Sequence, residues 1–335
     1  MNIAFICNHM LALPTLDYLL RHHDHSVVGL ATPDYQHEAN QRVLQLSQQH
    51  NIPYVVLEQR SLKRSMSTWL QQCRADVVFV LTFPFRIPDS VLTIPKHGFI
   101  NFHPGMLPQY RGPDPTFWQI RNGEKIGGFT IHRMDAEFDT GPILHVEQLP
   151  IDAQDTYGAH ANKLASTAVL AMNTILEQYP NWQFHPQVQS IEDQSRVNYL
   201  PRPELRDLII DWDRQPARDI QTLVRACNPE YTGAITYFRH QPVRIFQCSV
   251  RPVADAKRKS GAQRKTDRRN ASVINNATAG SVLIADPKEG ISILTSDQKL
   301  LRLGIVYTDV GFLTGGQFVR FYDIKAGEQL ENVMV

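Results

Sequence analysis

The sequence predicts an α/β protein: an open, mostly parallel sheet with helices on both faces, followed by a smaller C-terminal β-barrel-like domain. In the first 150 residues, short apolar runs rich in β-branched residues alternate with segments of helical spacing. Such alternation is typical of a parallel sheet in a Rossmann-like arrangement. Beyond residue 216 the pattern changes to many short strands separated by Gly-containing turns, which favours a small barrel. A chain of 335 residues is long enough to bury both cores.

The first part of the chain supplies the predicted sheet. Five short apolar runs are predicted to be strands, over residues 2–7, 26–31, 53–57, 76–81 and 98–103. Segments of helical spacing lie between them, over residues 14–23, 38–50 and 65–73. In open sheets of this kind, ligands bind beyond the carboxyl ends of the strands. We therefore expect the functional edge to hold residues 7–10, 82–88 and 101–105.

The rest of the chain sets the predicted domain borders. A strand, a loop, a second strand and a long amphipathic helix are expected over 128–134, 135–142, 143–151 and 156–179. A stretch rich in Pro, Arg and Asp then precedes the short C-terminal strands. We place an N-terminal domain at residues 1–197, a linker at 198–216 and a C-terminal domain at 217–335.

The composition is that of an ordinary soluble protein, with 42% hydrophobic and 20% charged residues. A net charge of +1 favours neither nucleic acid nor a membrane surface. No apolar stretch approaches the roughly 18 residues that a transmembrane helix needs, and the N-terminus does not resemble a signal peptide. The four cysteines have no metal-ligand spacing, which is typical of reduced thiols. We therefore expect a cytoplasmic protein without a metal.

Two polar clusters have an ordinary and a functional interpretation. The segment 254–280 carries seven Lys or Arg residues and almost no large apolar ones. We interpret it as a mobile basic insertion, and contact with an anionic substrate or nucleic acid is the alternative. His22, His23 and His25 could bind a metal, but at the end of a predicted helix we expect them to be solvated.

An amide and an imidazole end the last of the predicted parallel strands. Asn101 and His103 are separated by one residue, so strand alternation sends both side chains to the same side of the backbone. Pro104 and Pro108 stiffen the chain that follows. The pair either satisfies loop carbonyls or acts together in chemistry.

Asp139, in the loop after the 128–134 strand, can complete a catalytic group. A carboxylate beside His103 would fix its tautomer and stabilise the imidazolium. Asn101 could then donate a hydrogen bond to an oxygen that gains negative charge. No Ser or Cys is placed with a partner that would make it a nucleophile, so direct transfer of an acyl group fits better than an acyl-enzyme.

These residues belong to two motifs, "INFHPGMLPQYRG" and "GFTIHRMDAEFDTGPIL". Together they resemble the signature of the folate-dependent formyltransferases. That family includes methionyl-tRNA formyltransferase, the amino-sugar N-formyltransferases, the glycinamide ribonucleotide enzyme and the formyltetrahydrofolate hydrolases. Its pattern is Asn-x-His, then Leu-Pro-x-(Tyr/Trp)-Arg-Gly, then Asp-(Ala/Thr)-Gly about 36 residues after the His. The resemblance is strongest over residues 1–180 and continues more weakly through 210–238.

The resemblance implies transfer of a formyl group from 10-formyltetrahydrofolate to a primary amine, without a metal. It makes Asn101, His103 and Asp139 the catalytic residues. The stretches that match the family's pterin-binding segments are Phe85, Arg86, Ile87, Asp135, Ala136, Glu137, Phe138 and Asp139. For the acceptor we expect contacts from the first strand's edge, at Asn8, His9 and Met10. Trp118 either lines the acceptor pocket or packs the helix after the catalytic loop.

Two departures from the family pattern bear on the acceptor. Gly105 stands where the family often has a Ser. The tRNA enzymes carry a basic insertion after their second strand, whereas residues 31–44 here contain only Arg42 as a cation. The segments expected to form the mouth of the site (7–14, 32–40 and 83–90) add only Arg86.

We therefore predict a small acceptor, such as a nucleotide-linked amino sugar, with methionyl-tRNA as the alternative. Hydrolysis of formyltetrahydrofolate and a non-catalytic folate- or RNA-binding module are the further alternatives.

Overall fold

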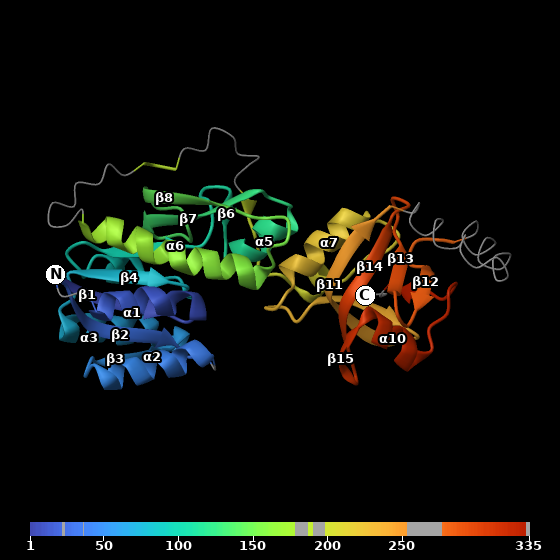
Figure 1. Ribbon diagram of the computed structural model, residues 1–335. Coiled ribbons are helices and arrows are strands. Elements are labelled where there is room, and N and C mark those ends of the chain that lie inside the picture. Colours follow the sequence, from blue (N-terminus) through green and yellow to red (C-terminus); the bar gives the residue numbers. More distant parts are fainter. Residues whose placement is uncertain (22–23, 36, 178–186, 190–197, 253–276, 333–335) are drawn as a thin grey trace, which may run out of the picture. The chain divides into compact units, whose positions relative to one another are not determined.

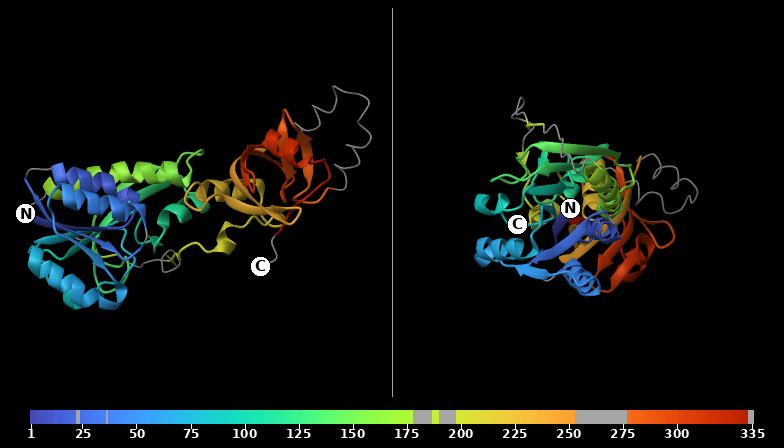
Figure 2. Two further views of the ribbon diagram at one scale, coloured as in Figure 1. Left: turned by 90° about the horizontal axis from the view of Figure 1, so that it is seen from below. Right: turned by 90° about the vertical axis from the view of Figure 1, so that its left-hand side faces the viewer.

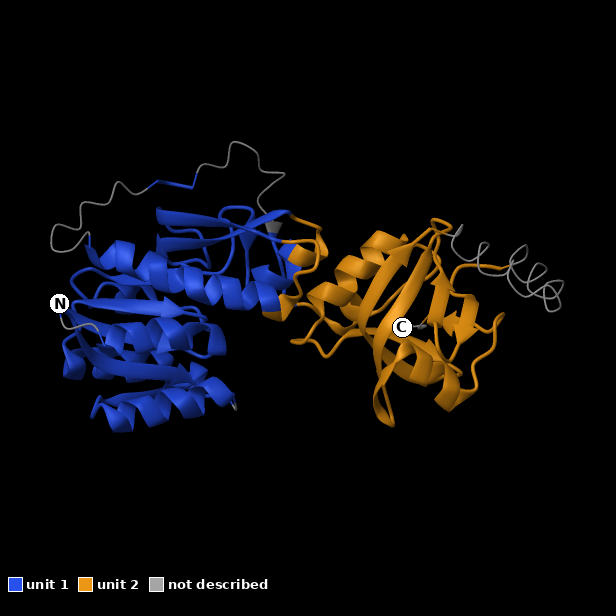
Figure 3. Cartoon of the chain, in the orientation of Figure 1, with its two compact units in different colours: residues 1–119, 125–151, 159–202 blue, residues 120–124, 152–158, 203–335 orange. Residues whose placement is uncertain are grey.

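The computed structural model describes residues 1–21, 24–35, 37–177, 187–189, 198–252 and 277–332. The chain forms two compact units (Figure 3). Unit 1 comprises residues 1–119, 125–151 and 159–202, and unit 2 comprises residues 120–124, 152–158 and 203–335. The linker expected over 198–216 thus falls across this division. Most of the basic insertion expected over 254–280, namely residues 254–276, lies outside the described residues.

Unit 1 is built on a seven-stranded sheet of order β3-β2-β1-β4-β5-β7-β8 (Figure 1). Its strands are β1 (Asn2–Cys7), β2 (Ser26–Pro33), β3 (Tyr54–Leu57), β4 (Val77–Leu81), β5 (Phe99–His103), β7 (Ile126–Arg133) and β8 (Ile143–Pro150). The first five are parallel, and β7 and β8 run antiparallel to their neighbours. The predicted open, mostly parallel sheet is therefore confirmed.

Helices cover both faces of this sheet (Figures 1 and 2). They are η1 (Met10–Ala12), α1 (Leu13–Arg21), α2 (Glu38–Gln49), η2 (Gln59–Ser61), α3 (Leu62–Cys73), α4 (Asp89–Leu92), α5 (Pro115–Arg121) and α6 (Tyr157–Glu177). Alternate residues of β1 enter different cores, because a strand sends successive side chains to opposite faces. Phe5 packs in the core formed with α1, α2 and α6, whereas Ile6 packs in the core formed with α3 and α4. None of the helices in the described parts of the chain is long and apolar enough to cross a bilayer.

Unit 2 contains an antiparallel sheet of order β12-β13-β14-β11-β10-β16, with β15 paired to β14. Its strands are β10 (Ala234–Phe238), β11 (Gln241–Arg251), β12 (Val282–Asp286), β13 (Gly290–Leu294), β14 (Leu300–Thr308), β15 (Gly311–Thr314) and β16 (Leu330–Glu331). Its helices are η4 (Leu205–Leu208), α7 (Ala217–Ala226) and α10 (Gly315–Tyr322). The prediction of a β-barrel-like C-terminal domain is confirmed: the antiparallel sheet forms a half-barrel. The fully buried Trp212 joins its core and donates from Nε1 to Thr236 Oγ1 at 2.9 Å.

A two-stranded sheet in unit 1 joins distant parts of the sequence. Strand β6 (Tyr110–Arg111) pairs in parallel with β9 (Asn198–Tyr199), and Leu200 N donates to Arg111 O at 2.9 Å. Gly112 follows β6 with φ +122°, and a Cβ atom there would lie 2.1 Å from Leu200 O. Both its dihedral angle and the close approach of β9 require glycine at this position.

We predict that Gly112→Ala disrupts the pairing of β6 with β9. Gly311→Ala is the matched control, since Gly311 has φ +105° but open space where a Cβ would lie. The control should cost only the left-handed backbone penalty of about 1–2 kcal/mol. Gly112→Ala should cost more, because Leu200 O must move, and it should speed hydrogen exchange at the Leu200 amide. Equal losses of stability with an unchanged Leu200 amide would contradict this account.

Candidate active site

A cavity of about 770 Å³ opens in unit 1 beyond the carboxyl ends of β4 and β5. It lies at the edge where the strand pattern predicts a functional site. Polar side chains in its wall include Asn101 and His103 from β5, His132 from β7, Asp139 from the loop after β7, and Tyr199 and Arg202 from the segment around β9. The three predicted catalytic residues are thus brought together in one cavity.

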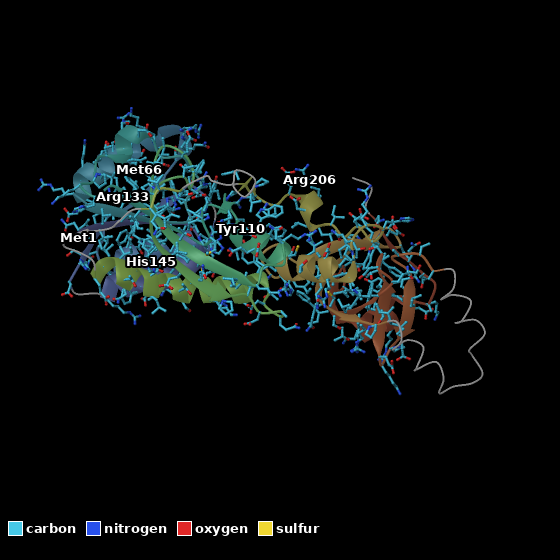
Figure 4. All side chains as sticks on the ribbon, turned by 90° about the horizontal axis from the view of Figure 1, so that it is seen from above. Met1, Met66, Tyr110, Arg133, His145 and Arg206 are labelled. Atoms are coloured by element: carbon cyan, nitrogen blue, oxygen red, sulfur yellow. The ribbon has the colours of Figure 1, made fainter. Side chains whose placement is uncertain are left out.

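The tautomer of His103 is fixed by a backbone carbonyl. Its Nε2 lies 2.6 Å from the carbonyl oxygen of Tyr110, a residue labelled in Figure 4. A carbonyl oxygen can only accept, so Nε2 carries the proton. The opposite nitrogen, Nδ1, lies 3.5 Å from Asp139 Oδ1. A neutral His103 therefore keeps its lone pair on Nδ1, the nitrogen that faces the carboxylate.

Asp139 is held in the ionised form although its side chain is almost fully buried. Burial alone would raise its pKa, but His103 and His132 next to Oδ1 and the Gly112 N–H on Oδ2 outweigh that effect. The net result holds the pKa of Asp139 well below its usual range. The backbone of Asp139 is left-handed, with φ +58°, a conformation that Asp adopts more readily than most residues other than Gly.

The loop that carries Asp139 is clamped by Gln189. Gln189 Nε2 donates to the carbonyl oxygens of Asp139 and Gly141, at 3.0 and 2.8 Å. Its Oε1 accepts from Arg111 Nη2 at 2.6 Å. The carboxylate therefore has a defined position that does not depend on its own hydrogen bonds alone.

His103 itself has a pKa below the usual imidazole value. Burial has the largest effect and lowers the pKa, and His132 lowers it further. The charge of Asp139 and the Tyr110 carbonyl act in the opposite direction. His103 is therefore neutral at pH 7 and can accept a proton at Nδ1.

His132 is a member of the site that the sequence reasoning missed. It is 1% exposed, and its Nδ1 lies 2.8 Å from the carbonyl oxygen of Arg133, which places the proton on Nδ1. Its Nε2 therefore accepts from Asn101 Nδ2 at 3.0 Å. The second Asn101 N–H points to Asp139 Oδ1 at the longer distance of 3.4 Å. Asn101 and His132 are direct partners across β5 and β7, a register that the pattern of apolar residues does not encode, so no sequence signal pointed to His132.

The residues predicted to bind folate are divided between the cavity wall and the core. Glu137, Phe138 and Asp139 line the cavity. Phe85 and Ile87 are buried in a hydrophobic cluster instead.

The other residues predicted to bind folate are Arg86, Asp135 and Ala136. Arg86 bonds to Ala136 O and to the Glu137 carboxylate, and Asp135 Oδ1 accepts from Thr140 Oγ1 at 2.6 Å. Phe83 and Pro84 also line the cavity, and they are the two residues directly before the predicted folate-binding stretch that begins at Phe85. Their role in binding folate stays a prediction.

The predicted acceptor residues have different positions. Asn8 lines the cavity, whereas His9 caps the start of η1, and its Nδ1 accepts from Leu11 N at 3.1 Å. Met10 is 44% exposed. Trp118 packs edge-to-face on Phe117 and donates from Nε1 to Pro201 O at 2.8 Å. Trp118 thus fixes the segment that follows β9.

Among the described residues, no group of three or more His, Cys, Asp or Glu side chains could hold a metal ion. His22 and His23 lie outside the described residues. The protonated Cys7 thiol, whose pKa burial raises to about 12, is unsuited to act as a nucleophile.

The sequence matches the formyl transferase family over residues 1–176 and the family's C-terminal domain over residues 204–309. Methionyl-tRNA formyltransferase of Pelotomaculum thermopropionicum is 32% identical over 281 residues, which cover 82% of this chain and 87% of the relative. The match to the relative from Halothermothrix orenii is 28% identical and covers 98% of this chain and 100% of that protein.

Solved structures share the fold at low sequence identity. The Helicobacter canadensis N-formyltransferase, solved with folinic acid and dTDP-3-aminofucose, has a TM-score of 0.61 at 15% identity, covering 90% of this chain and 98% of that one. HypX from Aquifex aeolicus with tetrahydrofolic acid has a TM-score of 0.60 at 16% identity and covers 98% of this chain. The chain spans only about half, 48%, of HypX. With the family match extending over most of both units, the chain belongs to the formyl transferase family and is a folate-dependent formyltransferase.

Proposed function

We propose that this enzyme transfers a formyl group from 10-formyltetrahydrofolate to a primary amine, with Asn101, His103 and Asp139 as its catalytic residues. The observation that carries the proposal is the geometry of His103. Its basic nitrogen faces a buried, ionised carboxylate at 3.5 Å, and its other nitrogen is tied to a carbonyl at 2.6 Å. This arrangement suits a group that must take up a proton during acyl transfer.

His103 is the general base in this proposal. An amine can attack a formyl carbon only through its free electron pair, so the attacking nitrogen must lose a proton. Nδ1 of His103 takes that proton. The resulting imidazolium donates from Nε2 to Tyr110 O and from Nδ1 to Asp139 Oδ1, so both N–H groups have acceptors. When the tetrahedral intermediate collapses, the imidazolium can return the proton to the departing folate nitrogen.

Asn101 stabilises the oxyanion in the same step. In the described structure its two N–H groups point to His132 Nε2 at 3.0 Å and to Asp139 Oδ1 at 3.4 Å. The longer of these two bonds is the weaker one. As the imidazolium donates to Asp139 Oδ1, it competes for that oxygen, and the weaker N–H of Asn101 becomes available to the developing oxyanion. His132 meanwhile keeps the amide in place.

The cavity has the size and chemistry that a folate needs. Its volume of about 770 Å³ lies within the range of small-molecule sites. Phe83, Pro84 and Phe138 provide apolar wall against which a pterin ring could pack. The presence of folinic acid and tetrahydrofolic acid in two structures of the same fold supports this assignment.

The relatives favour methionyl-tRNA as the acceptor, the reverse of the order that the sequence suggested. Relatives that carry this name match up to 98% of this chain. A nucleotide-linked amino sugar is the second candidate. It is favoured by the cavity wall, where Arg202 is the single Lys or Arg among the described lining residues. A tRNA site generally contains several such cations.

We predict that Asp139→Asn lowers the pKa of His103. The negative charge of Asp139 raises that pKa in the native enzyme, so its removal should shift the pH midpoint of the His103 imidazole further down. NMR titration of the ring protons measures the shift. His97 is the internal control, because Asp139 is not among the causes of its own lowered pKa. A His103 midpoint that stays or rises would contradict the proposed pairing.

Asn101→Ala should lower kcat by about 10² to 10³, the usual cost of losing one oxyanion donor. The KM for the formyl donor should change little, since the lost interaction strengthens only as charge develops. His132→Leu is the companion variant: it keeps Asn101 but removes the acceptor that orients it, so it should give a smaller loss of kcat. A rise in KM alone in Asn101→Ala would show that Asn101 only binds substrate.

A competition assay tests the acceptor. Initiator methionyl-tRNA and a pool of nucleotide-linked amino sugars are offered together with limiting 10-formyltetrahydrofolate, and products are identified by mass spectrometry. We expect a higher kcat/KM for methionyl-tRNA, with a rate that falls as salt rises because phosphate contacts are screened. Preferential formylation of the sugar would establish the second candidate. Release of formate in the absence of any amine product would favour hydrolysis instead.

A further inference from the structure

Gln189 connects two segments of the site that are far apart in the chain. Its Oε1 accepts from Arg111 Nε at 3.2 Å and from Arg111 Nη2 at 2.6 Å. Its Nε2 donates to the carbonyl oxygens of Asp139 and Gly141, at 3.0 and 2.8 Å. Both N–H groups and both lone pairs of the amide are therefore used. The orientation of the amide is fixed by its partners, because a guanidinium can only donate and a carbonyl can only accept.

A short main-chain bridge brings Gln189 to this place. Gln187 and Ile143 exchange two hydrogen bonds, from N to O in each direction, both at 2.8 Å. Ile143 is the first residue of β8, directly after the loop that carries Asp139. Continued in the same antiparallel register, Gln189 stands opposite Gly141, and its side chain is buried at 8% exposure. Backbone pairing therefore delivers this amide to the catalytic loop.

Asp139 is consequently held at both of its ends. Gly112 N donates to the carboxylate at Oδ2, and Gln189 binds the main-chain carbonyl. Both contacts originate from neighbouring residues, directly from Gly112 and through Gln189 from Arg111. The main chain at Asp139 is left-handed, with φ +58°, and such a conformation persists in a residue other than Gly where its surroundings fix it.

We propose that Gln189 is a positioning residue of this enzyme: it fixes the main chain of Asp139 and thereby the separation of the Asp139 carboxylate from His103. This inference rests on the roles proposed above for His103 and Asp139. Gln189 is not a wall residue of the reaction cavity, so it acts through Asp139 and not on the substrate.

The geometry of the catalytic pair makes this separation decisive. Asp139 Oδ1 lies 3.5 Å from His103 Nδ1. An N–H···O hydrogen bond usually measures about 2.7–3.2 Å, so the pair must close slightly when the imidazolium forms. A loop that moved away instead would leave the new N–H group of His103 without its charged acceptor.

The test variant is Gln189→Met, which keeps the length and the neutrality of the side chain but removes its hydrogen bonds. Misplacement of a catalytic group by about 1 Å can cost about 10²-fold in rate, so we expect kcat to fall by about 10- to 100-fold. The KM for 10-formyltetrahydrofolate should change less.

Asn40→Leu is the matched control. Asn40 is 9% exposed, and its Nδ2 likewise donates to two carbonyl oxygens, those of Pro33 and Tyr35, at 2.9 and 2.8 Å. Both variants thus replace a buried amide that clamps two carbonyls by an apolar side chain of the same shape. We expect both to lower Tm, but only Gln189→Met removes a contact to Asp139.

The titration midpoint of His103 separates positioning from a general loss of stability. The charge of Asp139 raises the pKa of His103, so a carboxylate that is no longer held near Nδ1 should leave a lower midpoint in Gln189→Met. Asn40→Leu should keep the native midpoint. NMR titration of the ring protons measures all three proteins.

Gln189→Asn is the second variant, for the case in which Gln189→Met does not fold. It keeps the amide on a side chain that is one methylene shorter, so it cannot hold Arg111 and the loop together. Its His103 midpoint should shift in the same direction by a smaller amount.

A double-mutant cycle with Asp139→Asn shows whether Gln189 acts through Asp139. The carboxylate charge is already lost in that background, so adding Gln189→Met should lower neither the His103 midpoint nor kcat much further. A further fall as large as that in the native background would overturn the inference. A native midpoint and native kcat in Gln189→Met would do the same. A native enzyme that transfers no formyl group to any amine would reject the proposed function alone, because the midpoints still report whether Gln189 holds Asp139.

Discussion

Residues 110–112 hold the two ionisable groups of the site, His103 and Asp139, in place. The carbonyl of Tyr110 accepts from His103 Nε2, and the amide of Gly112 donates to Asp139 Oδ2. A buried carboxylate is costly unless donors and opposite charge compensate it. Here the compensation comes first from His103 and His132, and the Gly112 amide adds to it from a backbone whose direction is fixed by the pairing of β6 with β9. The ionisation state of the site therefore depends on two histidines together with a short piece of main chain.

The pKa values of Asp139 and His103 are both lowered, which leaves the carboxylate charged and the imidazole neutral near pH 7. Asp139 has a strongly lowered pKa, so it remains charged over the physiological pH range. Its contribution to stability is present above the ordinary carboxyl pKa and is lost as pH falls through the lowered value. His103 has a lowered pKa as well, because burial disfavours the imidazolium more than Asp139 favours it. A neutral base beside a permanent anion is the result.

The sequence predicted those parts of the site that are governed by local pattern. Alternation along one strand placed Asn101 and His103 on the same side, and the family motif pointed to Asp139. His132 was missed because its role depends on antiparallel pairing of β7 with β5, a register that the pattern of apolar residues does not encode. Arg202 was missed for a related reason: it reaches the cavity through a contact between segments that are distant in the chain, at Arg111 and Leu200. The prediction that only Arg86 supplies positive charge near the mouth counted the cations of residues 7–14, 32–40 and 83–90, and Arg202 lies outside these segments.

The attachment of β9 to its neighbours uses main-chain atoms of residues 200 and 201. The bonds that fix β9 run from Leu200 N and Pro201 O, so they make no demand on the side chains at 199 and 202. The close approach requires glycine only at position 112, where a Cβ would meet Leu200 O. Side chains on this segment can therefore change without moving the Tyr110 carbonyl or the Gly112 amide. Variation in the side chains at positions 199 and 202 is therefore compatible with an unchanged geometry of His103 and Asp139.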